Sequence, residues 1–141
     1  FPVAEANDVG IIVRLPLASG VLAGKMSLET EFAESDHRNY NRDGAALSQG
    51  ETFSGVPFEK ALDLVEHIRP MVPDGMSMAQ MAMRWLLDQS AVSTVITGAT
   101  RVEQVAENAS VSALPPLSSE LHARLTYFYW AEVAPAICVP V

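Results

Sequence analysis

The chain has 141 residues, of which 49% are apolar, and its formal net charge is −8. This length and composition suit one folded domain with a hydrophobic core, and they exclude a disordered chain. Nine Lys plus Arg, without a basic run, argue against a nucleic-acid partner. The one cysteine, Cys138, excludes an internal disulfide and a cysteine zinc site, and it lacks the local signature of a catalytic nucleophile.

Membrane and export signals are not visible in the sequence. No apolar run reaches membrane-spanning length, and the start lacks the basic region and long apolar run of a signal peptide. We therefore expect a cytoplasmic protein with no membrane partner. Because the chain opens at Phe1 with what resembles the tail of a helix, we interpret residues 1–141 as a single partial domain.

The first predicted strand runs from Gly10 to Leu17, within VGIIVRLPL. Its β-branched and almost continuously apolar residues are typical of a strand buried on both faces of a parallel sheet. The small residues of LASGVLAGK then predict a tight loop at the carboxyl end of this strand. Residues 26–56 follow as a long polar segment without a period, and a loop of this length in a compact domain is usually functional.

Two helices are predicted next. The first runs from Pro57 to about Met71, with apolar residues at helical spacing, and Pro57 suits its first turn. The second begins at Ser77, which has capping-box spacing with Gln80. Its expected buried stripe consists of Met78, Met81, Ala82, Trp85 and Leu86.

The second predicted strand covers residues 92–96, and a helix follows it from Thr100. Thr100 and Glu103 have the spacing of a capping box. A last helix is expected to be capped by Ser118 or Ser119. The buried face of the helix that begins at Thr100 is predicted to consist of Val102, Val105, Ala106 and Ala109.

The order of these elements predicts an α/β fold with an incomplete sheet. Strands that alternate with helices favour parallel pairing. Two strands alone cannot form a parallel sheet that is covered on both faces, so the pattern requires neighbouring strands that this chain lacks. We therefore expect part of a larger fold, or a chain that borrows strands from another copy, and we expect it to self-associate.

The stretch STVITGATRVEQVAEN, residues 93–108, predicts an anion-binding corner. A strand passes through Gly98 into a helix whose first backbone N–H groups are unpaired, and the helix dipole favours negative charge there. The alternative is an ordinary turn from strand to helix, in which Gly98 serves only the geometry. The residues of the corner by themselves leave both interpretations open.

Several motifs together resemble the C-terminal part of an aldo-keto reductase. They are PLASGVLAGK at 16–25, DHR at 36–38, MAMRWLLDQSAVSTVITGATRVEQVAEN at 81–108 and PLSSE at 116–120. Members of that family are (β/α)₈ TIM barrels that reduce aldehydes and ketones with NADPH. The resemblance implies the seventh strand to the C-terminal helix of the barrel, incomplete in this chain, with NADP(H) as cofactor and a small carbonyl compound as substrate.

The resemblance also implies the residues that bind the cofactor. The family loop around the pyrophosphate corresponds to Pro16, Leu17, Ser19, Gly20 and Lys25, and the anion corner of the eighth strand corresponds to Gly98 and Thr100. Arg38 falls where the family often has an arginine near the adenosine 2′-phosphate or the adenine ring. The helix that holds the adenosine end corresponds to Gln104, Glu107 and Asn108, which share one helical face.

The sequence departs from the family at several positions. Many members have an aromatic residue at Arg14, a lysine at Gly98 and an arginine at Gln104, so the choice between NADPH and NADH stays open. The catalytic Asp, Tyr, Lys and His of the family match no residue here. We therefore assign no catalytic residue and expect the chain alone to be inactive.

Two functional hypotheses follow, with no metal site in either. The first is the dinucleotide-binding part of a carbonyl reductase. The second is a non-catalytic nucleotide-binding or interaction module that self-associates, because some relatives of the fold are accessory subunits. The segment NYNRDG at 39–44 is similar to the start of a calcium loop, but residue 50 is glycine where the bidentate acid is required, so we predict a polar turn.

Overall fold

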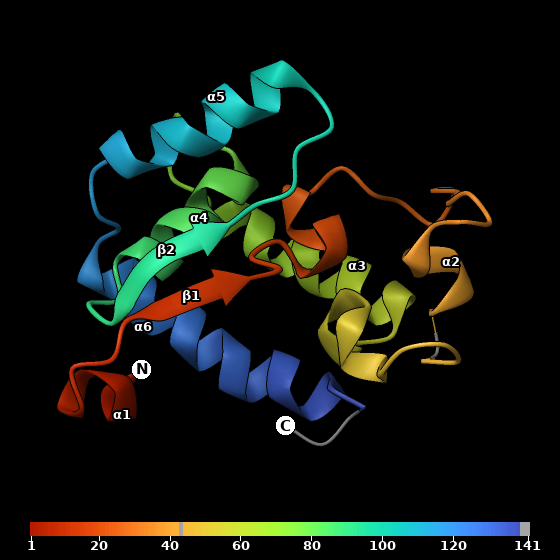
Figure 1. The fold of residues 1–141 in the computed structure, drawn as a ribbon, viewed down its shortest axis with the longest axis horizontal. Helices are drawn as coiled ribbons and strands as arrows, with labels where there is room; N and C mark the ends of the chain where they lie inside the picture. The colour runs from red at the N-terminus through yellow and green to blue at the C-terminus, as the bar shows by residue number, and fades with distance from the viewer. Residues whose placement is uncertain (43, 139–141) are drawn as a thin grey trace.

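The computed structural model describes residues 1–42 and 44–138. Within that part of the chain, no helix is long and apolar enough to cross a membrane. Short 3₁₀ turns and one π-helical turn join the main elements (Figure 1). The helices are α1 (Pro2–Ala6), α2 (His37–Tyr40), α3 (Phe58–Ile68), α4 (Met78–Leu87), α5 (Val102–Ser110) and α6 (Ser119–Phe128), and the strands are β1 (Ile11–Arg14) and β2 (Val92–Ile96).

The two strands form a parallel sheet. Ile11 lies opposite Val92 and Arg14 lies opposite Ile96, with one irregularity in the register after Ile11. The predicted bounds of the second strand are confirmed. The first strand is shorter than the predicted range Gly10 to Leu17, because Leu15 has a φ of 55° and turns the backbone out of the sheet.

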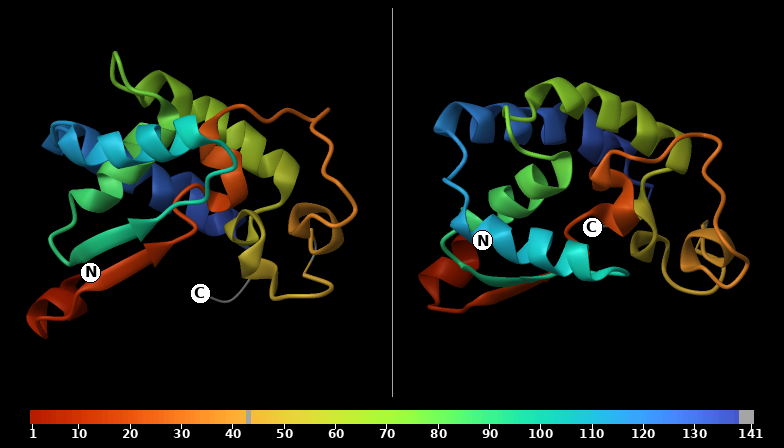
Figure 2. Two further views of the ribbon diagram at one scale, coloured as in Figure 1. Left: turned by 45° about the horizontal axis from the view of Figure 1, so that its top comes forward. Right: turned by 90° about the horizontal axis from the view of Figure 1, so that it is seen from above.

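One face of this sheet is exposed, so the prediction that the first strand is buried on both faces is wrong. Ile11 and Val13 are half-buried, whereas Ile12 is 61% exposed and Ile96 is 58% exposed. This alternation is typical of a strand with one covered face. In both views of Figure 2, the strands lie at the margin of the molecule with helices on one side, and α4 packs against β2.

The hydrophobic core lies among the helices. Helix α3 buries Ala61, Leu64 and Val65, and α6 buries Leu121 and Phe128. The connecting segments add apolar side chains to the same cluster, and their aromatic rings pack tightly. The ring of Phe53 stacks on that of Phe58, with centroids 4.8 Å apart, in a cluster that also contains Val21, Val56, Met78, Met81 and Leu117.

Local hydrogen bonds explain where two of the helices begin. The predicted capping box of α4 is confirmed, since the Gln80 N–H donates to Ser77 Oγ at 3.2 Å and the Ser77 N–H donates to Gln80 Oε1 at 2.8 Å. Ser118 caps α6 by accepting from the Leu121 N–H at 3.2 Å. Helix α3 ends at Ile68, three residues before the predicted Met71, and passes into a 3₁₀ turn over Arg69–Met71.

Helix α5 carries its apolar residues on the outside, and the predicted burial of this face is therefore wrong. Val102 is 80% exposed and Val105 is 58% exposed, and Ala106 and Ala109 are exposed as well. The residues have the spacing of an amphipathic helix, but no element of the described chain packs against them. An apolar helix face is buried only where another element packs against it, so the amphipathic spacing alone does not predict burial.

A polar cluster of Arg84, Asp88 and His122 ties α4 to α6. Asp88 accepts hydrogen bonds from Arg84 Nε, from the Leu117 N–H and from His122, each at 2.9 Å. Its side chain is 8% exposed. Burial raises the pKa of Asp88, but the hydrogen bonds from His122, Leu117 and Arg84 outweigh it, so the pKa lies below its ordinary value.

We expect Asp88→Asn to lower the free energy of unfolding by about 2–4 kcal/mol at pH 7, because it leaves Arg84 without its buried carboxylate. The contribution of Asp88 is present above about pH 4 and is lost as the pH falls through its lowered folded-state pKa. Urea unfolding at pH 7 and pH 3, followed by tryptophan fluorescence, measures both effects. Asp63→Asn, which breaks an exposed pair with Lys60, is the matched control. Equal unfolding midpoints for the two variants contradict the prediction.

Candidate functional site

The loop that follows β1 has an unusual backbone. Leu15, Ala18 and Ser19 all have positive φ, at 55°, 47° and 57°, which non-glycine residues rarely adopt. Such conformations persist only where surrounding contacts hold them. Ser19 Oγ accepts from the Phe53 N–H at 3.2 Å and donates to the Glu51 carbonyl at 3.5 Å. The segment 51–53 therefore holds this loop in place.

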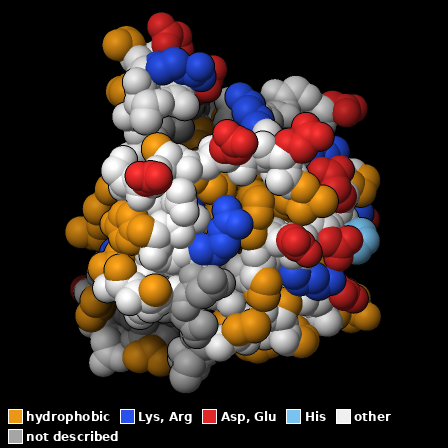
Figure 3. All heavy atoms as spheres, turned by 90° about the vertical axis from the view of Figure 1, so that its right-hand side faces the viewer, with side chains coloured by type: hydrophobic (Ala, Val, Ile, Leu, Met, Phe, Trp, Pro, Cys, Tyr) orange, Lys and Arg blue, Asp and Glu red, His pale blue; other side chains and the backbone are white. Residues whose placement is uncertain are grey.

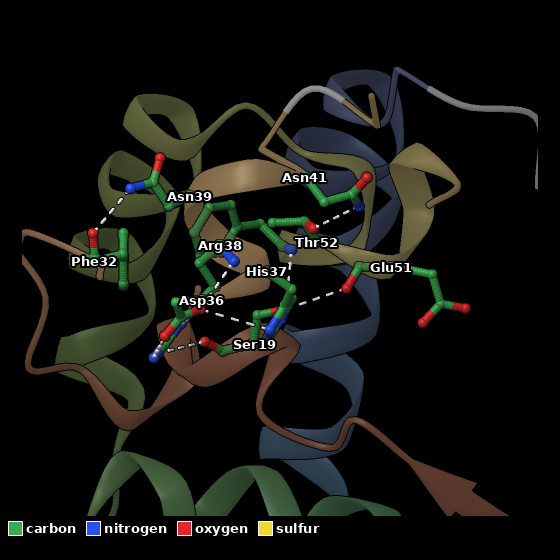
Figure 4. A network of polar contacts seen from close by, with 10 residues as sticks. Ser19, Phe32, Asp36, His37, Arg38, Asn39, Asn41, Glu51 and Thr52 are labelled. Carbon is green, nitrogen blue, oxygen red and sulfur yellow. Dashed lines mark hydrogen bonds and ion pairs between the residues drawn. The ribbon is translucent and has the colours of Figure 1, made fainter. Parts of the chain in front are cut away.

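Arg38, the second residue of α2, reaches the same loop. Its Nη1 donates to the Ser19 carbonyl at 3.4 Å (Figure 4). Its Nε and Nη2 donate to the two oxygens of Asp36, at 2.9 and 2.6 Å. The guanidinium carbon lies 4.6 Å from the centroid of the Phe32 ring. Three neighbours therefore fix the plane of Arg38 beside Ser19.

The Asp36 carboxylate offsets the positive charge of Arg38. The hydrogen bond from the Arg38 side chain lowers the pKa of Asp36 to about 2, against the effect of burial. Asp36 is therefore ionised at neutral pH. On the face seen in Figure 3, to which α2 belongs, acidic and basic side chains are also interspersed. The positive charge of Arg38 is therefore largely balanced at this place.

Gly20 allows the close approach of Arg38 to the loop. It has a φ of 94°, and a Cβ atom built on it lies 2.9 Å from Met26 Cε and 3.5 Å from Arg38 Nη1. A side chain at this position is strained by the backbone and crowded by its neighbours. Glycine at position 20 therefore has a structural reason, whatever ligand the loop binds.

Two buried polar residues, Asn41 and Thr52, support this arrangement, and sequence reasoning missed both. Asn41 is 0% exposed, Thr52 is 1% exposed, and Asn41 Nδ2 donates to Thr52 Oγ1 at 3.0 Å. Asn41 belongs to NYNRDG, which we interpreted as a polar turn. The available signal was an asparagine in a segment without a period, and this does not distinguish a buried side chain from an exposed one.

The second group of predicted residues meets where β2 leads into α5. Asn108 Nδ2 donates to Thr97 Oγ1 at 3.1 Å and to the Gly98 carbonyl at 3.4 Å. Gln104 Oε1 accepts from the N–H groups of Thr100 and Arg101, at 2.7 and 3.1 Å. Gln104 is therefore the residue that caps this helix, and the predicted box of Thr100 with Glu103 is wrong, because α5 begins two residues later than Thr100.

This corner is open at Gly98. A Cβ atom built on Gly98 meets nothing within 4 Å, and Gly98 does not have a positive φ. Within residues 1–42 and 44–138, the N–H groups of Gly98 and Ala99 have no hydrogen-bond acceptor, whereas the Gln104 oxygen already satisfies Thr100 and Arg101. The free N–H groups are thus those of Gly98 and Ala99, so the residues present fit a phosphate oxygen near Gly98 better than one near Thr100.

The structure brings together most of the predicted site residues in two groups. Ser19, Gly20 and Arg38 form the first, with Pro16 and Leu17 half-buried beside them. Gly98, Thr100, Gln104 and Asn108 form the second. Lys25 and Glu107 are exposed, and neither side chain has a hydrogen-bond or ion partner among the described residues. Arg14, which the resemblance places near the nicotinamide, forms an exposed ion pair with Glu51 at 2.9 Å.

A model of the Aldo/keto reductase family matches residues 1–129. The chain belongs to this family. It is 35% identical over 104 residues to the L-glyceraldehyde 3-phosphate reductase of Escherichia coli K12, covering 74% of this chain and 29% of that protein. It is 29% identical over 128 residues to a probable voltage-gated potassium channel subunit beta of Oryza sativa, covering 86% of this chain and 35% of that protein.

Other relatives of this aldo-keto reductase chain support the same fold. The NADH-specific methylglyoxal reductase of E. coli is 28% identical over 109 residues, covering 77% of this chain and 30% of that protein. The structure of a glycerol dehydrogenase from Gluconobacter oxydans matches 99% of this chain and 38% of its own, with a TM-score of 0.70 and 24% identity. The chain thus spans about a third of these relatives, and the predicted incomplete C-terminal part of a (β/α)₈ barrel is confirmed.

The aldo-keto reductase chain holds no candidate metal centre among its described residues, since no three His, Cys, Asp or Glu side chains lie together. Its polar groups at the strand ends include amides, hydroxyls and the guanidinium groups of Arg14 and Arg38, each paired with a carboxylate. These groups suit the binding of a neutral or anionic ligand.

We expect Gln104→Ala to loosen the start of α5 in this aldo-keto reductase, because the N–H groups of Thr100 and Arg101 lose their acceptor. The free energy of local opening falls by about 1 kcal/mol, the usual value of a lost cap. Hydrogen exchange of these two amides measures it. Gln104→Glu keeps an acceptor oxygen and serves as the control. Unchanged exchange in Gln104→Ala contradicts the assigned cap.

Proposed function

We propose that this chain is the dinucleotide-binding part of an NADP(H)-dependent aldo-keto reductase that, with the rest of its barrel, reduces aldehydes or ketones to alcohols in the cytoplasm. The observation that carries the proposal is the parallel pairing of Arg14 with Ile96. It makes the loops after β1 and β2 leave the same edge of the sheet. Ligands of open and closed α/β sheets bind at this carboxyl edge.

Each group of residues has a separate task in this proposal. The backbone of Ser19 and Gly20 approaches the pyrophosphate, and the N–H groups of Gly98 and Ala99 supply donors for a phosphate oxygen. One face of the Arg38 guanidinium packs on Phe32. In this proposal the other face stacks on an adenine ring. Asn108 shapes the corner, because its amide holds Thr97 and Gly98.

The reaction itself needs groups that this chain does not supply. When bound, the nicotinamide supplies the hydride for the carbonyl carbon. The carbonyl oxygen requires a proton donor, and none of the residues here matches the catalytic set that the family resemblance implies. We therefore propose that the 141-residue chain binds the dinucleotide without turning over a carbonyl compound.

The pairing of Asp36 with Arg38 bears on the choice of cofactor. A 2′-phosphate competes with Asp36 for the guanidinium, whereas a 2′-hydroxyl does not. Gly98 and Gln104 stand where many members have a lysine and an arginine for the 2′-phosphate. These features support a modest preference at most for NADPH, and the similarity to an NADH-specific reductase is consistent with that.

Binding is tested by titrating the purified chain with NADPH and following its fluorescence. We expect Arg38→Ala to weaken binding about tenfold, because the stacking surface and the contact with Ser19 are lost. Arg124→Ala removes an exposed arginine on α6 and serves as the control. No NADPH binding by the unaltered chain rules out the proposed function. Carbonyl-dependent oxidation of NADPH by the chain contradicts its proposed inactivity.

We expect Gly98→Lys to tighten NADPH binding about tenfold while leaving NADH binding nearly unchanged. The side chain has room at this position, and its ammonium group adds a charge-assisted hydrogen bond to the 2′-phosphate. Gly98→Gln has a similar length without charge and is the matched control. Equal gains for both cofactors are the result that speaks against a 2′-phosphate near Gly98.

A second candidate function, a self-associating module, is supported by the exposed apolar side chains. Ile12 and Ile96 lie on the open face of the sheet, and Val102 and Val105 lie on α5. An apolar cavity of about 1130 Å³ lies among α3, α4, α6 and the loop after β1, with Trp85 in its lining. Surfaces of this kind are usually covered by a partner, which we take to be a second copy of this chain.

Sedimentation velocity over a range of protein concentrations tests self-association. We expect species larger than a monomer, and we expect Ile12→Lys to shift them toward the monomer, because it places a charge on the open sheet face. Leu28→Lys, at an exposed position in the loop before α2, is the control. A compact monomer that unfolds cooperatively at all concentrations contradicts this candidate.

A further inference from the structure

Asn41 lies at the end of α2, outside the two groups of residues assigned to the dinucleotide. Its side chain is fully buried and uses its whole hydrogen-bonding capacity. Nδ2 donates to Thr52 Oγ1 at 3.0 Å and to the Ser48 carbonyl at 3.3 Å. Oδ1 accepts from the N–H groups of Ala46 and Leu47, at 3.1 and 2.6 Å. None of these bonds is available to a ligand, so any effect of Asn41 on binding is indirect.

The contact with Thr52 leads directly to the loop after β1. Thr52 is almost fully buried, and its two neighbours in the chain hold Ser19. The Glu51 carbonyl accepts from Ser19 Oγ (Figure 4). Ser19 Oγ in turn accepts from the Phe53 N–H. Asn41 therefore fixes Thr52, which lies in the chain between Glu51 and Phe53, the two partners of the Ser19 hydroxyl.

A second path joins the same two places through α2. The Asn41 N–H donates to the His37 carbonyl at 2.9 Å and closes the short helix that carries Arg38. Arg38 donates in turn to the Ser19 carbonyl. Contacts from two sides thus converge on Ser19, a residue with a φ of 57°. A backbone in this region of conformational space depends on such contacts.

We propose that Asn41 is a positioning residue which, through Thr52, holds the Ser19 loop in the conformation that binds the dinucleotide pyrophosphate. This inference rests on the proposed function. In this proposal, the buried amide of Asn41 holds α2 and the segment 51–53 in a fixed relative position, so that Arg38 contacts Ser19.

The test compares Asn41→Asp in two backgrounds, the unaltered chain and Ser19→Ala, by NADPH fluorescence titration. The carboxylate keeps the shape of the side chain and loses the donor to Thr52. We expect about a tenfold loss of affinity in the unaltered background and less than a twofold loss in Ser19→Ala, because the effect passes through Ser19. Equal losses in both backgrounds indicate a merely structural role and overturn the proposal, as does unchanged affinity.

Variants at Thr52 cover the case in which Asn41→Asp does not fold. Thr52→Val keeps the shape of the side chain in a buried place and removes the hydroxyl, whereas Thr52→Ser retains it. We expect Thr52→Val to lose about as much NADPH affinity as Asn41→Asp does. We expect Thr52→Ser to retain the affinity of the unaltered chain. Ala45→Asp, at an exposed position of the same segment, controls for the added charge. Equal affinity of the two Thr52 variants overturns the proposal.

Hydrogen exchange of the Phe53 amide separates this proposal from the proposed function. The measurement needs no cofactor, since the Phe53 N–H donates to Ser19 Oγ in the chain itself. Faster exchange in Asn41→Asp or Thr52→Val supports the holding role, even where the unaltered chain binds no NADPH and the dinucleotide site is thereby ruled out. Unchanged exchange in both variants overturns the role.

Discussion

The parallel pairing of β1 with β2 is the constraint on which the candidate site depends. It joins Arg14 to Ile96 and so fixes where the two glycine-containing loops begin. Each loop is then shaped by its own contacts, with Arg38 and the segment 51–53 around Ser19, and Gln104 and Asn108 around Gly98. Without the sheet, these two sets of contacts have no common edge. The helical core below supports the sheet mainly through α4.

The chain buries its helical core with its own residues, but it leaves one face of the sheet uncovered. The cluster around Phe53 and Phe58 is buried by segments of the chain itself. Ile12, Ile96 and Val102 remain exposed because the described residues hold no element that covers them. Exposed apolar side chains of this kind leave the isolated sheet less protected than the helical core.

Sequence reasoning succeeded where a signal was local and failed where a partner was distant. The strand at 92–96 and the caps at Ser77 and Ser118 depend on residues within a few positions. The strand and Ser77 were predicted, and Ser118 was one of two predicted alternatives. The two loops proposed to bind the dinucleotide were identified through the family resemblance. The end of β1 at Arg14 was missed because a positive φ at a leucine has no sequence signature. The exposure of α5, the capping by Gln104 and the buried networks around Arg38 and Thr52 depend on which segments meet in space.

The strand pairing also has a consequence for the order of folding. Ile11 and Val92 are about 80 positions apart along the chain, whereas the contacts within α3, α4 and α6 are local. Closing so long a loop costs chain entropy before strand pairing contributes any favourable free energy. We therefore expect the helices to form first and the sheet last. The edge that bears both loops is then the least protected part of the molecule. A ligand that touches both loops binds only the paired state, and by mass action it stabilises that last step.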